Sequence, residues 1–353
     1  MKVKSYILSH INHINFISRR LKISFIFHTF YFLLLTFNCF GQDIHFSQFY
    51  NSPLNLNPGL TGGFLGDIRV VGNQRSQWSS VTTPYSTFGL SIDANTIYNT
   101  PISVGLGFYN DKAGDSQFST LQIAPSIGYT IFIGDSSQTI TIGAQPTYTQ
   151  RSINYDKLKF DNQYNGVAYD ENLSNGETFS NEGRSYLNVH GGLSWNYSLG
   201  QRKSVAAGIA LHNIFNPKQS FFNNASITLN KRFTFHVEGV FKVSDKIDGI
   251  PRISIMTQDQ FKEIIFGGSG KYYLNNGNYK AAYLGFWYRN SDATYITAEL
   301  DFSNFHFGVS YDINLSSLKV ASRNRGGFEF SVIYIFEKFR PTIKRYKACP
   351  NYI

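Results

Sequence analysis

The chain has 353 residues, of which 42% are hydrophobic, 16% aromatic and 16% charged, with a formal net charge of +9. Soluble domains typically carry about 25% charged residues, so this composition favours a β protein whose outer surface is not fully in water. Disorder and a helical membrane protein are both excluded. Much apolar surface needs burial, and no apolar run after the first forty residues approaches the ~20 that a spanning helix needs.

Residues 1–41 differ from the rest of the chain and predict a secretory signal peptide. Five basic residues and no acid come first, and an apolar core from Ile23 to Phe40 precedes Gly41. This order is typical of a cleaved export signal, with a retained signal anchor as the alternative. Cleavage after Gly41 leaves a net charge of +4, so net charge no longer supports a nucleic-acid partner, and none is expected.

Residues 42–66 come before the first predicted strand. They should be irregular, because Pro53, Pro58 and several Gly and Asn residues interrupt them. Apolar side chains such as Phe46 and Phe49 indicate that this segment packs against the rest of the protein. A loose leader without such contacts is the alternative.

From Ile68 onward, apolar and polar residues alternate in segment after segment, as in residues 102–109 and 305–312. Successive side chains of a strand point to opposite faces, so each segment has one apolar and one polar face. A soluble β-sandwich would show the same alternation. The segments run for about ten residues, however, and their second face carries Gly, Ser, Thr and charges. Both features favour membrane-spanning strands around a wet lumen.

The predicted fold is therefore all-β: a transmembrane antiparallel β-barrel over residues 67–338 with about fourteen strands, an even number as in single-chain bacterial barrels. The predicted strands are Asp67–Trp78, Pro84–Asp93, Ile102–Tyr109, Gln117–Ile133, Gln138–Ile153, Arg184–Ser198, Ser204–Asn213, Arg232–Val243, Arg252–Gln258, Phe261–Leu274, Tyr279–Arg289, Ala293–Phe302, Phe305–Ile313 and Gly327–Glu337.

The connections between these strands support the same order. The short ones are residues 134–137, 199–203, 275–278 and 303–304, and all follow even-numbered strands. The long ones are residues 154–183, 214–231 and 314–326, and all follow odd-numbered strands. Short periplasmic turns and long external loops produce this parity in barrels, which puts both termini on the periplasmic side. Residues 339–353 then form a basic periplasmic tail.

The longest of these loops, residues 154–183, carries six acidic residues and two lysines, with tyrosines between them. Such an external loop is suited to docking a protein partner, since Tyr anchors interfaces. Calcium binding without EF-hand spacing, and a solvated loop without a partner, are the alternatives.

Charges on the polar strand faces are expected to point inward, because Arg or Lys on the lipid face near the midplane costs about 2–4 kcal/mol. The predicted lumen-facing charges are Asp93, Glu238, Lys242, Glu299, Asp301 and Asp312. They could form a plug network with residues 42–66, tune a pore, or simply be hydrated. Trp78, Trp195 and Trp287 suit the aromatic girdles at the membrane interfaces.

No chemical site is predicted from the motifs. The two cysteines exclude a disulfide framework and a cysteine-based zinc site, and the eight histidines do not cluster, so neither a metal nor a cofactor is expected. A barrel hydrolase would need Ser, His and a carboxylate or amide together. Ser and Asn are so frequent here that chance neighbours carry no signal, and the chain is expected not to be an enzyme.

Motifs from residue 42 to residue 350 carry a resemblance to a known family. Their residues are Phe46, Ser47, Gln48, Asn57, Pro58, Thr61, Gly62, Arg69, Arg75, Gln77, Trp78, Cys349 and Pro350, joined by GVSYDIN from Gly308 and GGFEFSVIY from Gly326. Together they resemble the PorP/SprF family of type IX secretion system outer-membrane proteins of Bacteroidetes. Gly59 stands where the family usually has Ala, and Gln74 where an aromatic residue is commoner.

The resemblance implies a barrel in the cell outer membrane, in contact with outer-membrane lipid, that works with the type IX secretion machinery. It implies assistance in the export or surface anchoring of large adhesin-type proteins, including those used in gliding motility. About fourteen strands enclose too narrow a lumen for a folded adhesin, so docking is expected rather than conduction. The alternative is a passive porin or small-molecule transporter with an open lumen.

Overall fold

The computed structural model describes residues 43–77, 83–95, 100–134, 137–177, 181–222, 224–316 and 325–337. The chain divides into residues 1–41 and residues 42–353, and every described residue belongs to the second unit. The predicted signal peptide, Trp78 and the tail with Cys349 and Pro350 lie outside the described residues.

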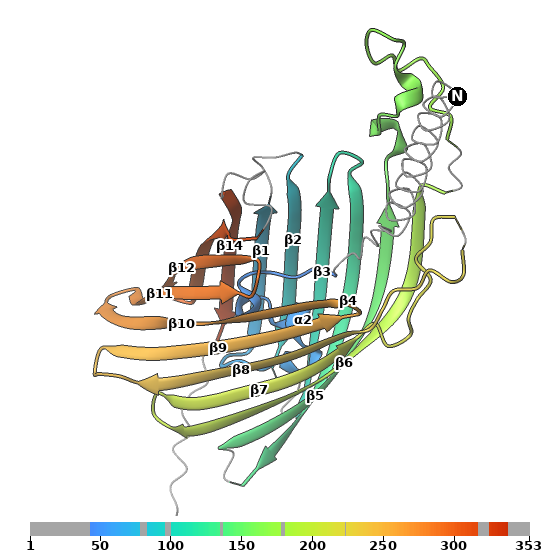
Figure 1. Cartoon of the computed structure of the whole chain (residues 1–353). Helices are drawn as coiled ribbons and strands as arrows, with labels where there is room; N and C mark the ends of the chain where they lie inside the picture. Colours follow the sequence, from blue (N-terminus) through green and yellow to red (C-terminus); the bar gives the residue numbers. More distant parts are fainter. Residues whose placement is uncertain are drawn as a thin grey trace, which may run out of the picture. The chain divides into compact units, whose positions relative to one another are not determined.

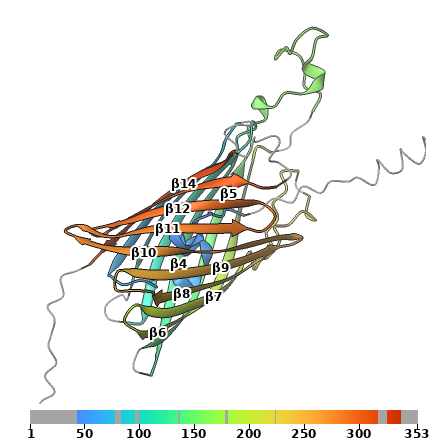
Figure 2. The same ribbon diagram turned by 60° about the vertical axis from the view of Figure 1, so that its left-hand side comes forward.

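The described residues form fourteen antiparallel strands that close into one barrel (Figure 1), which confirms the predicted fold. Each strand pairs with its neighbours in the sequence, and β1 pairs with β14 from Ile68 opposite Phe336 to Ser76 opposite Phe328. Figure 2 shows the strands running obliquely around the barrel. The strands are β1 Ile68–Gln77, β2 Tyr85–Ala94, β3 Ile102–Ala113, β4 Phe118–Ile133, β5 Gln138–Ser152, β6 Gly183–Gly200, β7 Lys203–His212, β8 Arg232–Lys242, β9 Ile247–Gln258, β10 Phe261–Asn276, β11 Tyr279–Arg289, β12 Ala293–Phe302, β13 Phe305–Asn314 and β14 Arg325–Phe336.

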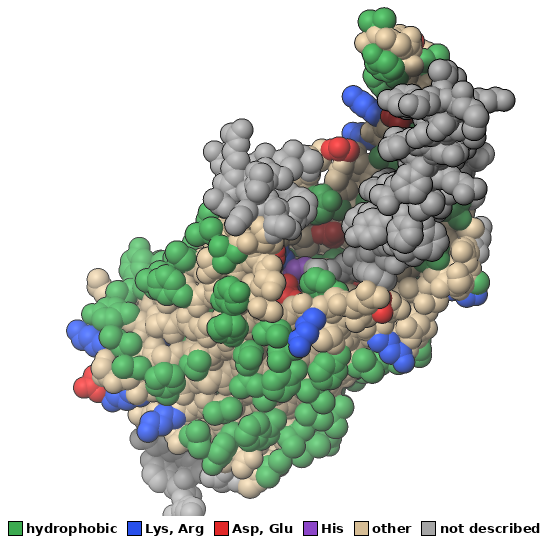
Figure 3. All heavy atoms as spheres, in the orientation of Figure 1, with side chains coloured by type: hydrophobic (Ala, Val, Ile, Leu, Met, Phe, Trp, Pro, Cys, Tyr) green, Lys and Arg blue, Asp and Glu red, His purple; other side chains and the backbone are tan. Residues whose placement is uncertain are grey.

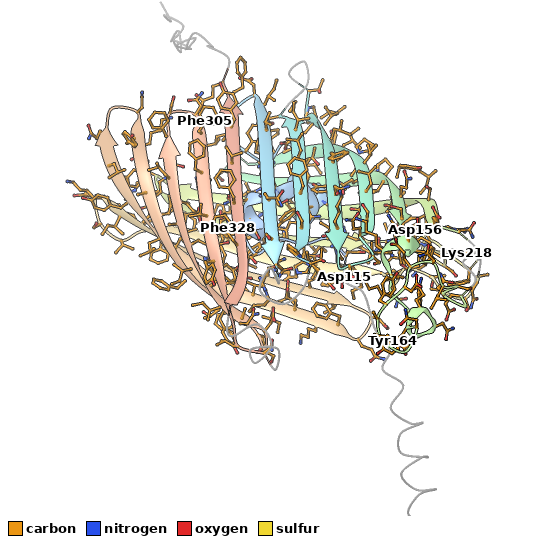
Figure 4. The ribbon with its side chains drawn as sticks, turned by 90° about the horizontal axis from the view of Figure 1, so that it is seen from above. Asp115, Asp156, Tyr164, Lys218, Phe305 and Phe328 are labelled. Carbon is orange, nitrogen blue, oxygen red and sulfur yellow. The ribbon has the colours of Figure 1, made fainter. Side chains whose placement is uncertain are left out.

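The barrel is apolar outside and polar inside. In β2, Leu90 and Ile92 are exposed, while the alternating residues Ser91 and Asp93 are buried. Figure 3 shows apolar side chains spread over the outer wall, and Phe305 and Phe328 in Figure 4 belong to this exposed apolar face. A soluble protein shows the opposite arrangement, so the outer face is built for the hydrocarbon of a membrane.

The two ends of the barrel differ. On the turn side, the β4–β5, β6–β7, β8–β9, β10–β11 and β12–β13 connections are short, and residues 95–101 join β2 to β3. The loop side carries the long connections, residues 153–182, 213–231 and 315–324. All three long connections therefore lie at one end, as the parity of the sequence predicted. The β3–β4, β9–β10 and β11–β12 connections at that end are also short.

Strand β9 begins at Ile247 rather than at the predicted Arg252. Gly249 and Pro251 are typical of turns, which hid the start of the strand from the sequence pattern. In the barrel, pairing with β10 continues through Pro251 to Ile247, which lies opposite Tyr272. Neighbouring strands thus extend this strand beyond what its own residues favour.

Ahead of β1, the N-terminal segment (residues 43–66) contains three short helices, η1 Phe49–Asn51, α2 Pro53–Leu56 and η2 Pro58–Leu60. Proline opens α2 and η2, where its missing N–H costs nothing. Helices of three or four residues are unstable alone, so contacts with the barrel must hold them. Within the described residues, no helix is both long enough and apolar enough to cross a membrane.

The outer face makes one quantitative prediction. Leu284 lies near the middle of β11 and is 54% exposed. Replacing it with arginine (Leu284→Arg) is expected to destabilise the barrel in lipid vesicles by about 2–4 kcal/mol, because the guanidinium would face hydrocarbon. Denaturant unfolding in vesicles measures the loss. Leu284→Met is the control, and equal stability of the two variants would contradict a lipid-facing position.

Candidate functional site

The N-terminal segment crosses the inside of the barrel from the loop side to the turn side. At its start, Asp43 contacts Asn213 and Gln258, which lie at the loop-side ends of β7 and β9. At its end, the Asp67 N–H donates to Phe336 O (2.9 Å) at the turn-side end of β14. In Figure 1, α2 lies within the ring of strands. We therefore treat the segment and the inner wall that holds it as the candidate site.

Glu329 of β14 binds backbone N–H groups near the start of the segment. The carboxylate accepts the N–H of Ser47 (2.7 Å) and the N–H of Gln48 (2.9 Å). The side chain of Gln48 also donates to Ser310 Oγ (3.2 Å) and Glu329 O (3.2 Å). Glu329 is 1% exposed, so these charge-assisted bonds are shielded from water.

Two arginines balance the buried carboxylates around this point. Arg289 Nη1 lies 3.2 Å from Asp312 Oδ2, and Arg75 lies 3.8 Å from both Asp312 and Glu329. Ser47 joins the same network, because its hydroxyl lies 3.1 Å from Asp312 Oδ2 and 2.5 Å from Arg289 Nη2. Removing one charge would leave the other buried charges of this network out of balance, which is strongly unfavourable.

Phe46 packs beside this network in a small apolar cluster with Ile44, Tyr109 and Ala124. Its ring also approaches Gly89 of β2, where a Cβ would lie 3.0 Å from Phe46 Cζ. The Phe46-Ser47-Gln48 motif thus supplies one apolar anchor, a bridging hydroxyl and an amide, each matched by the inner wall.

Aromatic rings of the first helix, η1, pack against aromatic rings of the inner wall. Tyr50 stacks on Trp287 (centroids 5.1 Å apart), Trp287 stacks on Tyr295 (5.8 Å), and Phe49 meets Trp287 edge-on (6.0 Å). Tyr295 also donates its hydroxyl to Ser47 O (2.7 Å). Trp287 is 2% exposed, so the prediction that it belongs to an outer girdle is wrong.

Glu299 of β12 binds the hydroxyl of Tyr50, and His306 of β13 joins Glu299 to Asp301. The Tyr50 hydroxyl donates to Glu299 (2.5 Å), and His306 lies 3.1 Å from Glu299 and 2.7 Å from Asp301. The Tyr50 phenol is thus a hydrogen-bond donor to a buried carboxylate. A helix of the segment is in this way joined to β12 and β13.

Glycines of adjacent strands make room for the middle of the segment. Gly128, Gly143 and Gly192 lie opposite one another across β4, β5 and β6. A Cβ at Gly143 would overlap the Pro58 carbonyl, one at Gly192 would overlap the Asn57 side chain, and one at Gly128 would lie 3.0 Å from Thr61 O. These three positions, which we call the glycine groove, allow the backbone of η2 to lie directly on the sheet.

Asn57 and Thr61 fix η2 in this groove. The Asn57 side chain accepts the Gly59 N–H (2.7 Å), donates to Leu193 O (3.1 Å) and lies 3.1 Å from His236 Nε2. Thr61 donates to Pro58 O (2.8 Å) and lies 3.0 Å from Ser126 Oγ. Both residues are fully buried, so their motif positions correspond to contacts with the wall.

Arg69 and Asp93 close the segment at the turn side. Asp93 accepts Arg69 Nε (3.0 Å) and Nη2 (2.7 Å) and also the Gly62 N–H (2.8 Å). Arg69 Nη2 donates to Leu60 O (3.2 Å). Gly62 has φ of +72°, a conformation that glycine adopts without strain. This bidentate pair clamps the chain just before it enters β1.

Three of the remaining predicted residues do not bind the segment directly. Glu238 pairs with Arg252, whose guanidinium lies 4.0 Å from the centroid of Tyr50. Lys242 is exposed at the turn-side end of β8 and pairs with Asp245 (2.6 Å). Gln77 is partly buried at the loop-side end of β1. The segment itself contacts Asp93, Glu299 and Asp312.

Sequence reasoning missed Glu329, Arg289, Trp287 and Tyr295 as parts of the site. A signal for Trp287 was present, because Leu284, Phe286 and Tyr288 form the apolar face of the same strand and strict alternation then turns Trp287 inward. In the same way, Phe328 and Phe330 turn Glu329 inward. Within the described ranges, no group of three or more His, Cys, Asp or Glu side chains is placed to hold a metal ion.

Comparison with solved structures finds similar folds. The Ralstonia pickettii toluene transporter TbuX matches with a TM-score of 0.50 and 9% identity, over 81% of this chain and 94% of that chain. The CymD monoaromatic hydrocarbon channel matches with a TM-score of 0.49 and 10% identity, over 82% of this chain and 94% of that chain. A comparison with curated proteins finds no match.

An apolar outer wall around a polar interior, in one closed antiparallel sheet, defines a membrane β-barrel, here with its own N-terminal segment inside. The sequence matches the family model of the type IX secretion system membrane protein PorP/SprF over residues 38–334. The chain therefore belongs to the PorP/SprF family, and the resemblance seen in its motifs is confirmed.

Proposed function

We propose that this barrel resides in the outer membrane and serves type IX secretion as a plugged, non-enzymatic docking component. It would assist export or surface anchoring of large adhesin-type proteins, including those of gliding motility. Outer-membrane lipid, the secretion machinery and the secreted protein are its partners. The observation that carries the proposal is the N-terminal segment inside the lumen, bonded to the wall from Asp43 to Gly62.

A plug of this kind argues against a passive pore. The contacts come from strands around the barrel, including β2, β6, β12 and β14. Many of the bonding side chains are almost fully buried, so displacing the segment would leave several polar groups unpaired. A lumen filled in this way suits a protein that works through its surfaces.

The loop side offers a docking surface. The loops 153–182 and 213–231 are connected, because Asn181 Nδ2 donates to Phe221 O (2.8 Å). Arg151, near the loop-side end of β5, also bonds Gln219 of the second loop. Figure 4 shows Asp115, Asp156, Tyr164 and Lys218 gathered at this end. Val167, Phe215 and Phe222 are 87%, 67% and 61% exposed. Exposed apolar side chains on polar loops are typical of protein-binding surfaces.

The charge of this surface indicates the chemistry of the partner. The acidic residues of the loop between β5 and β6, such as Asp156, Asp161 and Glu171, are exposed, and the loop has only two lysines against six acids. Complementary charge steers association, so the partner should present a basic patch with apolar side chains for the exposed aromatics.

Neutralising the loop makes a prediction. Replacing Asp156, Asp161, Asp170 and Glu171 by their amides is expected to cut surface display of the adhesin at least tenfold, because a charge-complementary encounter is lost. Surface labelling of a deletion strain complemented with the variant measures display. The matched control is Asp245→Asn, an exposed acid on the turn side, which should leave display unchanged. Full display by the loop variant would contradict docking at this loop.

The proposal as a whole is tested by gene deletion and by planar bilayers. Deletion should remove an adhesin-type protein from the cell surface, and the purified barrel should show almost no ion conductance. The alternative function, a porin or small-molecule transporter, predicts steady conductance and an unchanged surface proteome. That result would overturn the secretion role.

A further inference from the structure

The first described residue of the segment is bound at the base of a long loop. Asp43 Oδ2 accepts Asn213 Nδ2 (2.5 Å) and Gln258 Nε2 (3.2 Å), and the Asp43 N–H donates to Gln258 Oε1 (3.2 Å). Asp43, Asn213 and Gln258 are all buried.

Asn213 is the first residue of the β7–β8 loop, and Asn230 is the last but one. Asn230 O accepts from both Asn213 Nδ2 (3.1 Å) and Gln258 Nε2 (3.2 Å). Asp43 thus completes a ring of hydrogen bonds that closes the loop at its base. A charged acceptor in such a ring contributes more than a neutral one.

A second path runs through Arg151, next to the loop-side end of β5. Arg151 Nη2 lies 4.0 Å from Asp43 Oδ1, while its Nη1 bonds Gln219 in the middle of the β7–β8 loop. Gln219 in turn donates to Thr228 O (3.1 Å) across the loop. The segment is therefore connected both to the base and to the body of the loop.

We propose that Asp43 is a latch that couples the seating of the N-terminal segment to the conformation of the β7–β8 loop. A partner of this loop then favours the seated segment if it binds more tightly when the segment is seated, and the released segment if it binds more tightly when it is released. By linkage, the state of the segment changes the affinity of the loop for this partner by the same factor. This inference rests on the proposed docking function and extends it. The conformation of the loop then changes how firmly the segment is held in the lumen.

The experiment is hydrogen–deuterium exchange on the full barrel in lipid nanodiscs, without any partner. Asp43→Ala is expected to raise exchange about tenfold or more in residues 213–231 as well as in residues 43–48, because a charged acceptor is lost. Replacing residues 220–227 by two glycines tests the reverse direction and should raise exchange in residues 43–48.

Asp93→Ala is the matched control, since Asp93 also holds the segment with a buried carboxylate but at the turn side. It should raise exchange near Gly62 and leave residues 213–231 unchanged. The latch is overturned if Asp43→Ala frees residues 43–48 while the loop exchanges as in the wild type, or if Asp93→Ala loosens the loop equally. Because no partner is present, this outcome is independent of the secretion assays.

Discussion

Replacing Glu329 by alanine should release the start of the N-terminal segment and open the barrel. The change removes the acceptor of two buried backbone N–H groups, those of Ser47 and Gln48. It also removes one of the carboxylates that lie close to Arg75. Removing one partner of a buried ion pair costs about 3–5 kcal/mol. We expect steady conductance in planar bilayers, where the wild type stays closed, and faster exchange in residues 46–48.

The matched variant is Glu329→Gln. Its amide keeps the shape and one acceptor oxygen but loses the charge and the second acceptor. It should lie between the wild type and Glu329→Ala in both measurements. Unfolding of the whole barrel would appear as loss of its heat-modifiable migration on gels. This control distinguishes unfolding of the barrel from release of the segment alone. A folded, closed Glu329→Ala barrel would show that the segment does not depend on this carboxylate.

Filling the glycine groove is the second change with a large expected effect. Gly143→Val places side-chain atoms where the Pro58 carbonyl lies, and the backbone of η2 must move away. Overpacking of this kind costs about 1–3 kcal/mol, and here it falls on the segment because the strand is held by two neighbours. We expect increased conductance and increased protease cleavage between Asn57 and Thr61.

Gly270→Val is the control for this variant. It makes the same change within a strand, but a Cβ at Gly270 would meet no atom within 4 Å. Gly270 lies opposite Leu284, on the lipid-facing side of the barrel. The control should stay closed and as stable as the wild type. If both variants opened, the cause would be strand propensity rather than the groove.

The class of fold could be predicted because a barrel strand carries its signal locally. Alternation within about ten residues marks two faces, and the lengths of the connections mark two ends. Strand β9 shows the limit of this reasoning, since Gly249 and Pro251 look like a turn and only pairing with β10 keeps them in a strand. Trp287 shows another, because residue type suggested a girdle while strand parity placed it inside.

The contacts within the site could not be predicted in the same way. Ser47 and Glu329 are 282 positions apart, and Asp43 and Gln258 are 215 apart. Nothing local to Glu329 identifies the backbone groups that it accepts. The family motifs marked Asn57, Thr61 and Arg69 as special, but only the barrel shows that each of them binds the inner wall.

The part of the inner wall that holds the N-terminal segment comes from both the first and the last strands of the barrel. Asp93 in β2 and Glu329 in β14 both bind it, and they meet around the lumen only when β1 pairs with β14. The segment is then a tethered ligand that recognises the closed cylinder alone, and mass action makes such a ligand stabilise the state that it binds. It therefore stabilises the closed barrel during assembly. A barrel in which β1 and β14 are not paired would conduct ions and would be short-lived.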